Sequence, residues 1–214
     1  MPDYFQNKYR SDSHRLKGWD YRTPGWYFVT ICTYDGICYF GEIRNKIMGL
    51  SEIGGMVWNY WYEIPEHQSS VRLGSFIVMP NHVHMTIGLT DPNPGNTTVE
   101  TCHGTSLQSD GSGMQKNFMA EISPKSGSLS IIINHFKGAI RTWCKNKGYG
   151  DFAWQPGFHD HIVRTPRSLH NIDAYIRTNP DRWEEDPYHP GNLEKPQMDR
   201  GRRDVPWHVS TTKR

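Results

Sequence analysis

The sequence lacks the features that define several large protein classes. No two of its four cysteines form a CxxC pair, so a zinc ribbon is not expected. No apolar run approaches the roughly 20 residues of a membrane-spanning helix, and the opening MPDYFQNKYR has no apolar stretch of the signal-peptide kind. We therefore expect a cytoplasmic protein, with no membrane partner, whose cysteines are reduced. The cysteines are Cys32, Cys38, Cys102 and Cys144.

The sequence also lacks a strong charge of either sign. The formal net charge is only +2 over 214 residues, so overall charge does not identify a nucleic-acid-binding protein, and a local basic surface would be required. Aromatic residues, by contrast, are plentiful at 13%, with eight Trp and eleven Tyr. Such side chains can build a core, but they can also stack on nucleic-acid bases.

The pattern of residues predicts an arm, one domain and a tail. Residues 1–25 interleave basic and aromatic side chains and form either a surface-docked arm or a DNA-contacting arm. Residues 26–186 form the domain. Residues 187–214 are polar and form the tail. Within the domain, residues 90–127 are rich in Gly, Ser, Thr, Asn and Pro and are expected to be a flexible loop inserted into the fold.

Hydrophobic periodicity predicts an α+β domain of ferredoxin-like βαββαβ type. Alternating or β-branched runs indicate strands and 3.6-residue stripes indicate helices. The order is strand, helix, strand, strand, helix, strand, which gives a mostly antiparallel sheet with two helices on one face. A further helix is added at the C-terminal end. The expected elements are strands at 26–35, 71–80, 82–89 and 158–165 and helices within 51–68, 128–148 and 168–186. Pro65 should stop the first helix, and Pro180 should end or kink the last one, whose N-cap is Ser168 or Asn171. Residues 38–50 are expected to continue as a second hairpin arm.

The segment PNHVHMTI carries the strongest local signal for chemistry. His82 and His84 flank Val83 at the start of a predicted strand, so both imidazoles face the same side. Two adjacent imidazoles suit a divalent metal if a third ligand comes from elsewhere. Alternatively, they are two surface histidines at the end of a strand.

The segment IDAYIRTNP provides a possible nucleophile and a possible ligand. Tyr175 and Asn179 are four residues apart and share one helix face. A phenol has a reference pKa of about 10, so it needs a Lewis acid or a base nearby before it can attack a phosphodiester. The Asn179 amide oxygen would complete a ligand set suited to Mg²⁺ or Mn²⁺. Alternatively, Tyr175 is an ordinary core residue of an amphipathic helix.

Four segments in this order resemble the REP-associated tyrosine transposases. They are FIVMPNHVHMTI, HFKGAIR, WQPGFHDHIVR and IDAYIRTNPDRW, and the resemblance runs from Trp26 to Trp183. The His82-Val83-His84 triplet resembles the HUH motif of these single-tyrosine transposases, which are bacterial relatives of small insertion-sequence transposases.

The resemblance implies a metal-dependent endonuclease and strand transferase that cuts and rejoins single-stranded DNA beside a repeat hairpin. Tyr175 would be the nucleophile that forms a 5′-phosphotyrosine link, and His82, His84 and Asn179 would bind Mg²⁺ or Mn²⁺. The partner would be single-stranded DNA with a palindromic hairpin, in the bacterial cytoplasm at the nucleoid. The protein would act as a monomer or a homodimer.

Other readings of the same residues remain open. Lys137, Arg141 and Arg164 are either DNA contacts or members of a solvated face. His159 and His161 form a second candidate pair, for which a structural or DNA-contacting role is preferred. A hairpin-binding regulator with an unused site is an alternative function. A replication initiator or relaxase with HUH chemistry is another, but the single tyrosine and the modest length argue against it.

Overall fold

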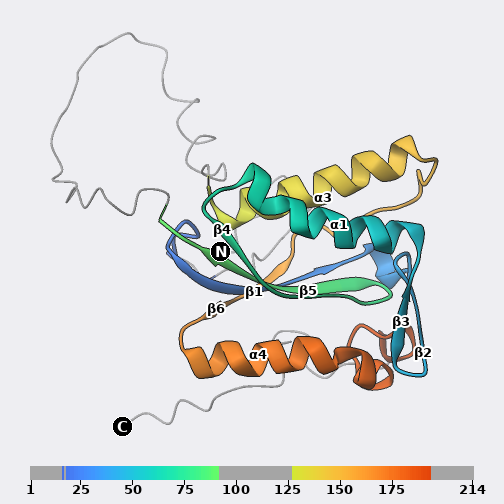
Figure 1. Cartoon of the computed structure of the whole chain (residues 1–214). Coiled ribbons are helices and arrows are strands. Elements are labelled where there is room, and N and C mark those ends of the chain that lie inside the picture. The colour runs from blue at the N-terminus through green and yellow to red at the C-terminus, as the bar shows by residue number, and fades with distance from the viewer. Residues whose placement is uncertain (1–15, 17, 92–126, 194–214) are drawn as a thin grey trace, which may run out of the picture.

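The computed structural model describes residue 16, residues 18–91 and residues 127–193 (Figure 1). The predicted arm at 1–25 and tail at 187–214 are therefore covered in part. The predicted insertion at 90–127 lies almost wholly outside the described residues. No helix in the described part of the chain is long and apolar enough to cross a membrane.

A four-stranded antiparallel sheet forms the centre of the domain. Its order is β4-β5-β1-β6, and β1 pairs with both β5 and β6. The central position of β1 and β5 follows from their composition, because nearly every residue of both strands is buried. The strands are β1 (Gly25–Cys32), β4 (Val71–Val78), β5 (His82–Leu89) and β6 (His159–Val163).

Two helices cover one face of this sheet and a third covers the other. Figure 1 shows α1 (Glu52–His67) and α3 (Leu129–Asn146) side by side above the sheet and α4 (Pro166–Thr178) below it. The order β1-α1-β4-β5-α3-β6 is the predicted ferredoxin-like βαββαβ plan, and α4 is the predicted addition. The predicted fold class is confirmed.

The main core lies between the sheet and the helix pair α1–α3. Alternate residues of the central strands point into it, including Val29, Ile31, Met85 and Ile87, which are fully buried. A smaller apolar cluster on the opposite face joins Phe28 to α4. The two clusters place the even-numbered residues of β5, including both histidines, on the face that α4 covers.

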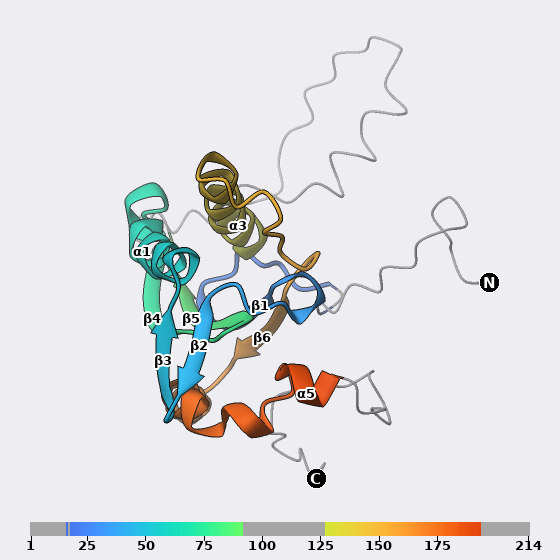
Figure 2. The same cartoon turned by 90° about the vertical axis from the view of Figure 1, so that its right-hand side faces the viewer.

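The chain after α4 turns back beneath the sheet. A 3-10 segment, η2 (Asn179–Glu185), follows α4 directly and leads to the short helix α5 (Pro190–Leu193). Figure 2 shows this segment crossing below the strands. Pro180, which was predicted to end or kink the tyrosine helix, stands at the start of η2.

The segment after β1 departs from the prediction. Residues 38–50 were expected to continue as a second hairpin arm beside the first strand. Instead, β2 (Gly41–Arg44) and β3 (Ile47–Leu50) pair with each other in a separate sheet after the short helix η1 (Tyr34–Gly36). Both edges of β1 are already occupied by β5 and β6, and the turn residues Asn45 and Lys46 adopt positive φ values that suit a tight hairpin.

Two helix boundaries also differ from the prediction. Pro65 was expected to stop the first helix, but α1 continues to His67. A proline in the last turn removes one hydrogen bond, whereas the same turn buries Ile64. The tyrosine helix begins earlier than expected, because Thr165 rather than Ser168 or Asn171 is its N-cap and accepts a bond from the Ser168 amide at 3.1 Å.

Two adjacent glycines in α1 provide a test of this packing. A Cβ on Gly54 would lie 2.2 Å from the Phe40 carbonyl oxygen, whereas a Cβ on Gly55 would meet nothing within 4 Å. We expect Gly54→Ala to lower the free energy of unfolding by about 1–3 kcal/mol through overpacking. Gly55→Ala should raise it by up to about 1 kcal/mol through helix propensity. Urea denaturation of both variants measures the difference, and equal effects would contradict the close contact.

Candidate metal and tyrosine site

The pairing of β1 with β5 puts both histidines on the face covered by α4. His84 stands opposite Thr30 and His82 stands opposite Cys32. Both imidazoles are buried, and their Nε2 atoms face each other at 3.1 Å. The other ring nitrogens are also occupied, because His84 Nδ1 lies 2.8 Å from Thr30 Oγ1 and His82 Nδ1 lies 2.9 Å from Asn81 Oδ1. The pair is therefore a buried feature, unlike two surface histidines at a strand end.

Burial keeps both imidazoles neutral. It lowers the pKa of His84 from 6.5 to about 3. It also lowers the pKa of His82 well below its ordinary value, and the neighbouring His84 lowers it further. At neutral pH each ring therefore has one nitrogen with a lone pair, which is the form that binds metals.

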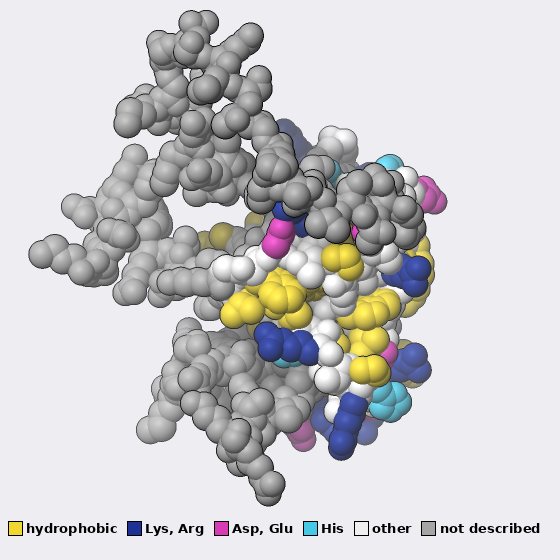
Figure 3. All heavy atoms as spheres, turned by 90° about the vertical axis from the view of Figure 1, so that its left-hand side faces the viewer, with side chains coloured by type: hydrophobic (Ala, Val, Ile, Leu, Met, Phe, Trp, Pro, Cys, Tyr) yellow, Lys and Arg dark blue, Asp and Glu magenta, His cyan; other side chains and the backbone are white. Residues whose placement is uncertain are grey.

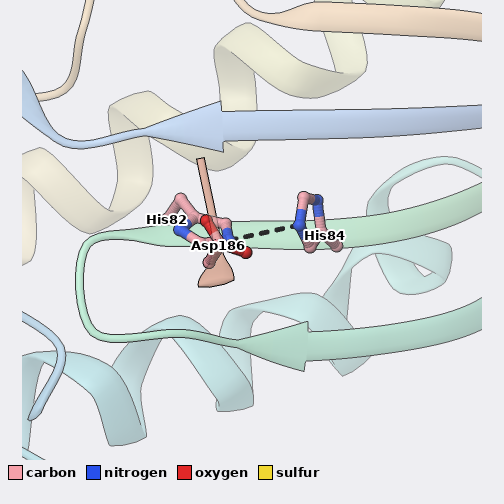
Figure 4. A group of neighbouring side chains, drawn as sticks. All are labelled: His82, His84 and Asp186. Atoms are coloured by element: carbon pink, nitrogen blue, oxygen red, sulfur yellow. Dashed lines mark hydrogen bonds and ion pairs between the residues drawn. The ribbon is translucent and has the colours of Figure 1, made fainter. Parts of the chain in front are cut away.

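A carboxylate from the segment after η2 completes the group. Asp186 Oδ2 lies 3.9 Å from His82 Nε2, and one ligand atom each from His82, His84 and Asp186 all lie within 4.8 Å of one another. Figure 4 shows the carboxylate beside the two imidazoles that β5 presents. Burial raises the pKa of Asp186 to about 6, against hydrogen bonds from Tyr188 and Asn179 that lower it. Two neutral imidazoles do not compensate the charge of this buried carboxylate.

Asp186 was not among the residues chosen from the sequence. It lies 102 positions after His84 by residue number, in a stretch that reads only as a short turn leading to a polar tail. No spacing rule connects it to the strand, although the buried setting follows from Trp183 and Asn179 packing beside it. Only the tertiary structure brings it to the histidines.

Asn179, the predicted third ligand, lies in the same cluster. It is 2% exposed, and its side chain hydrogen-bonds to both Tyr175 and Asp186. Its Oδ1 atom is buried and has no hydrogen-bond partner in the described structure. A buried acceptor without a partner is costly, and a cation would satisfy it. Ligation by Asn179 stays a prediction.

Tyr175 reaches the group from α4. Its hydroxyl lies 3.4 Å from His84 Nε2, and its ring contacts His84 and the edge of Phe28. Burial and, less strongly, the charge of Asp186 raise the pKa of Tyr175 to about 12, while Asn179 and Arg182 oppose the rise. The phenol is therefore neutral at neutral pH.

These donors fit a divalent cation. One nitrogen from each imidazole and one carboxylate oxygen converge from β5 and the segment after η2, and the nearby Asn179 has an unpartnered amide oxygen. Mixed nitrogen and oxygen ligands of this kind suit Mn²⁺, Mg²⁺ or Zn²⁺. The site could therefore hold a metal ion next to a tyrosine hydroxyl, an arrangement that suits nucleophilic attack on a phosphate.

The remaining candidate residues lie outside this cluster. Lys137 Nζ donates to the carbonyls of Gln155 at 2.8 Å and Gly157 at 2.7 Å, and Arg141 donates to the Phe152 carbonyl. Both side chains thus hold the loop after α3, and their contact with DNA stays a prediction.

Arg164 and the second histidine pair occupy β6 and its end. Arg164 directly follows β6 and is exposed. His159 stands opposite Thr30 and His161 opposite Phe28, so they share the sheet face of His84. Neither belongs to the metal-ligand group found among the described residues. DNA contact by Arg164 stays a prediction.

Comparisons with known proteins give a sequence relative and weaker structural likenesses. The chain is 31% identical to an uncharacterized protein of Haemophilus influenzae over 185 residues, which span 84% of this chain and 96% of that protein. No family model matches the chain.

The structural likenesses are to transposases. A REP-associated tyrosine transposase bound to a REP hairpin matches with a TM-score of 0.47 and 14% identity, over 85% of this chain and 74% of that one. A proposed transposase from Deinococcus radiodurans R1 matches with a TM-score of 0.33 and 16% identity, over 76% of this chain and 96% of that one.

The buried Asp186 predicts a stability that depends on pH and metal. Its folded pKa of about 6 lies above the reference value of 3.8. The stability that this group contributes is therefore complete below pH 3.8 and is lost as pH rises through 6. In metal-free protein at pH 7.5, Asp186→Asn should raise the free energy of unfolding by up to about 3 kcal/mol. At pH 4 the gain should be small.

Denaturation at both pH values, with and without Mn²⁺, measures this effect. The matched control is Glu185→Gln, which neutralises an exposed carboxylate next in the chain and should change stability little. Mn²⁺ should stabilise the wild type and the control but not Asp186→Asn. A metal-free Asp186→Asn variant that is less stable than wild type at pH 7.5 would refute the conclusion that the Asp186 charge destabilises the metal-free protein.

Proposed function

The chain belongs to the same family as the Haemophilus influenzae protein, and we propose that it is a metal-dependent, single-tyrosine endonuclease and strand transferase for single-stranded DNA. The observation that carries the proposal is the position of the Tyr175 hydroxyl, 3.4 Å from His84 Nε2 at the edge of the buried ligand group. This position puts a possible nucleophile beside the proposed metal ligands.

His82, His84 and Asp186 would hold the metal, with Asn179 Oδ1 as a further oxygen ligand. We propose Mg²⁺ or Mn²⁺, because these ions prefer oxygen ligands such as Asp186 and Asn179 and commonly act on phosphate substrates. When bound, such an ion polarises phosphoryl oxygens and stabilises the charge that develops on them. It would also neutralise Asp186, which is one cause of the raised Tyr175 pKa.

Tyr175 would carry the covalent step. Its hydroxyl loses a proton to solvent and its oxygen forms a bond to the phosphorus of a DNA phosphodiester. The bond between that phosphorus and the 3′ oxygen breaks, and the 3′ oxygen takes up a proton, which leaves a 5′-phosphotyrosine and a free 3′-OH. The reverse attack by a 3′-OH rejoins a strand and releases the tyrosine, so no ATP is needed.

The substrate would be single-stranded DNA beside a repeat hairpin. The transposase that matches in structure is itself bound to a REP hairpin, and we extend that partner to this chain as a proposal. On the face seen in Figure 3, Lys and Arg side chains lie beside exposed hydrophobic side chains. Lys and Arg side chains suit single strands, whose phosphate backbone carries the charge that they neutralise.

One observation favours a second candidate function. The side chains of His82, His84 and Asp186 are all at most 4% exposed, so a phosphate cannot approach them in this conformation. That burial suits a hairpin-binding regulator whose site is unused. The two functions differ in whether a covalent protein–DNA product forms.

The first test is covalent attachment. Wild-type protein, Mn²⁺ and labelled single-stranded DNA carrying a host repeat hairpin should give a protein–DNA band on a denaturing gel. Tyr175→Phe should abolish the band and retain hairpin binding, because only the nucleophilic oxygen is lost. Tyr62→Phe removes an exposed hydroxyl on α1 and is the matched control, which should behave as wild type.

The outcomes separate the two candidates. A band that survives in Tyr175→Phe would exclude Tyr175 as the nucleophile. Intact hairpin binding without a band in wild type, on every hairpin and with Mn²⁺, would favour the regulator.

The second test compares Asp186 and Asn179 as the third metal ligand. We expect Asp186→Asn to weaken Mn²⁺ binding by more than Asn179→Ala, because a carboxylate contributes a full charge to a hard cation and an amide does not. Titration of free Mn²⁺ by electron paramagnetic resonance gives both affinities without DNA. A larger loss in Asn179→Ala would instead make Asn179 the principal third ligand.

A further inference from the structure

Asn81 is the last of the three residues between β4 and β5 and directly precedes His82. It is 1% exposed, and its own backbone carbonyl accepts a bond from the Thr33 amide at 2.9 Å. The positive φ values recorded for non-glycine residues belong to Asp35, Asn45 and Lys46 within the described chain. The backbone at residue 81 therefore does not call for asparagine, and the reason for this residue lies in its side chain.

The Asn81 carboxamide makes three hydrogen bonds that differ in kind. Its Nδ2 donates to the Gly36 carbonyl at 2.9 Å and to the Tyr188 carbonyl at 2.7 Å. Its Oδ1 lies 2.9 Å from His82 Nδ1. A carbonyl oxygen can only accept a hydrogen bond, so both amide hydrogens must point at the two carbonyls. The orientation of the amide is thereby fixed by chemistry, with Oδ1 toward the imidazole.

This orientation decides where the proton of His82 lies. An amide oxygen can only accept, so His82 Nδ1 must carry the proton and donate it. In a neutral imidazole the other nitrogen, Nε2, then has the lone pair. That atom faces His84 Nε2 and Asp186 Oδ2, at 3.1 Å and 3.9 Å. The tautomer that can bind a metal is therefore present before any metal arrives.

Thr30 does not impose the same choice on His84. Its hydroxyl lies 2.8 Å from His84 Nδ1 and can either donate to that nitrogen or accept from it. The bonds of Asn81 therefore permit only one tautomer of His82, whereas Thr30 permits either tautomer of His84.

We propose that Asn81 is a positioning residue of the metal site. It fixes His82 in the tautomer whose Nε2 lone pair can bind a metal, and it also hydrogen-bonds to the segment that carries Asp186. The second role follows from Tyr188, because the Tyr188 amide also donates to Asp186 Oδ1 at 2.7 Å. One side chain therefore holds His82 and the backbone of the segment that carries Asp186. The inference rests on the proposed metal-binding function.

Aspartate or leucine would not replace Asn81. An aspartate could still accept from His82, but it would place a second oxygen against the Gly36 and Tyr188 carbonyls. A leucine would leave the imidazole N–H and both carbonyls without partners. Aspartate thus removes only the bonds to the two carbonyls, whereas leucine removes these bonds and the bond to His82.

The experiment reads the tautomer directly in metal-free, ¹⁵N-labelled full-length protein. Two-bond correlations between ring nitrogens and ring protons distinguish Nδ1–H from Nε2–H imidazoles, and His82→Ala identifies the His82 signals. Wild type should show His82 as Nδ1–H. Asn81→Leu should lose that tautomer in part or whole and should bind Mn²⁺ on the order of 10–100-fold more weakly.

Two further variants keep the test decisive. Asn81→Asp retains the acceptor, so His82 should stay Nδ1–H; this variant also serves if Asn81→Leu does not fold. Asn192→Ala is the matched control, because Asn192 donates at 2.9 Å to the backbone carbonyls of both Glu184 and Asp186 and thus contacts the same segment from another side. It should loosen the segment of Asp186 and leave the His82 tautomer unchanged.

Several results would overturn the proposal. They are a wild-type His82 in the Nε2–H form, an unchanged tautomer or Mn²⁺ affinity in Asn81→Leu, and a lost tautomer in Asn81→Asp or Asn192→Ala. None of these measurements uses DNA or Tyr175. A protein that forms no covalent DNA product would refute the proposed function while leaving the tautomer result intact.

Discussion

The pairing of β1 with β5 determines where every group of the site can lie. Side chains alternate across a strand, so a slip of one residue would send His82 and His84 into the core and bring Val83 out. The observed register sets His84 opposite Thr30 and keeps Val83 opposite Ile31, both buried in the main core. Apolar packing on one face of β5 thus fixes the position of the polar groups on the other face.

Those polar groups are held in place at a cost to stability. Burial keeps two imidazoles neutral and raises the pKa of the Asp186 carboxylate to about 6. Burying such groups costs free energy unless other groups pair with them. Hydrogen bonds offset part of this cost, through Thr30, Asn81 and the Tyr188 amide. The part that they leave, including the unpartnered Asn179 oxygen, is what a bound cation would satisfy. A cluster of buried titratable groups with perturbed pKa values is typical of functional sites.

The sequence was sufficient for the parts of the site that depend on local periodicity. A two-residue period in PNHVHMTI put both imidazoles on one face, and a helical period put Tyr175 and Asn179 on another. Asp186 could not be found this way, since its position depends on the turn of the chain after α4. The predictions of where α1 ends and of how residues 38–50 pair were wrong for a similar reason. Tertiary packing and already occupied strand edges outweighed the local sequence signals.

The same helix delivers the phenol and begins the segment that delivers the carboxylate. Ile172 and Ile176 fix α4 against the sheet, so Tyr175 between them has a position set by apolar packing. Asn179 ends that helix and hydrogen-bonds to both Tyr175 and Asp186. A shift of α4 would therefore move Tyr175 and Asn179 together, while the histidines stay with the sheet. The distance between the Tyr175 hydroxyl and His84 therefore depends on how α4 packs against the sheet.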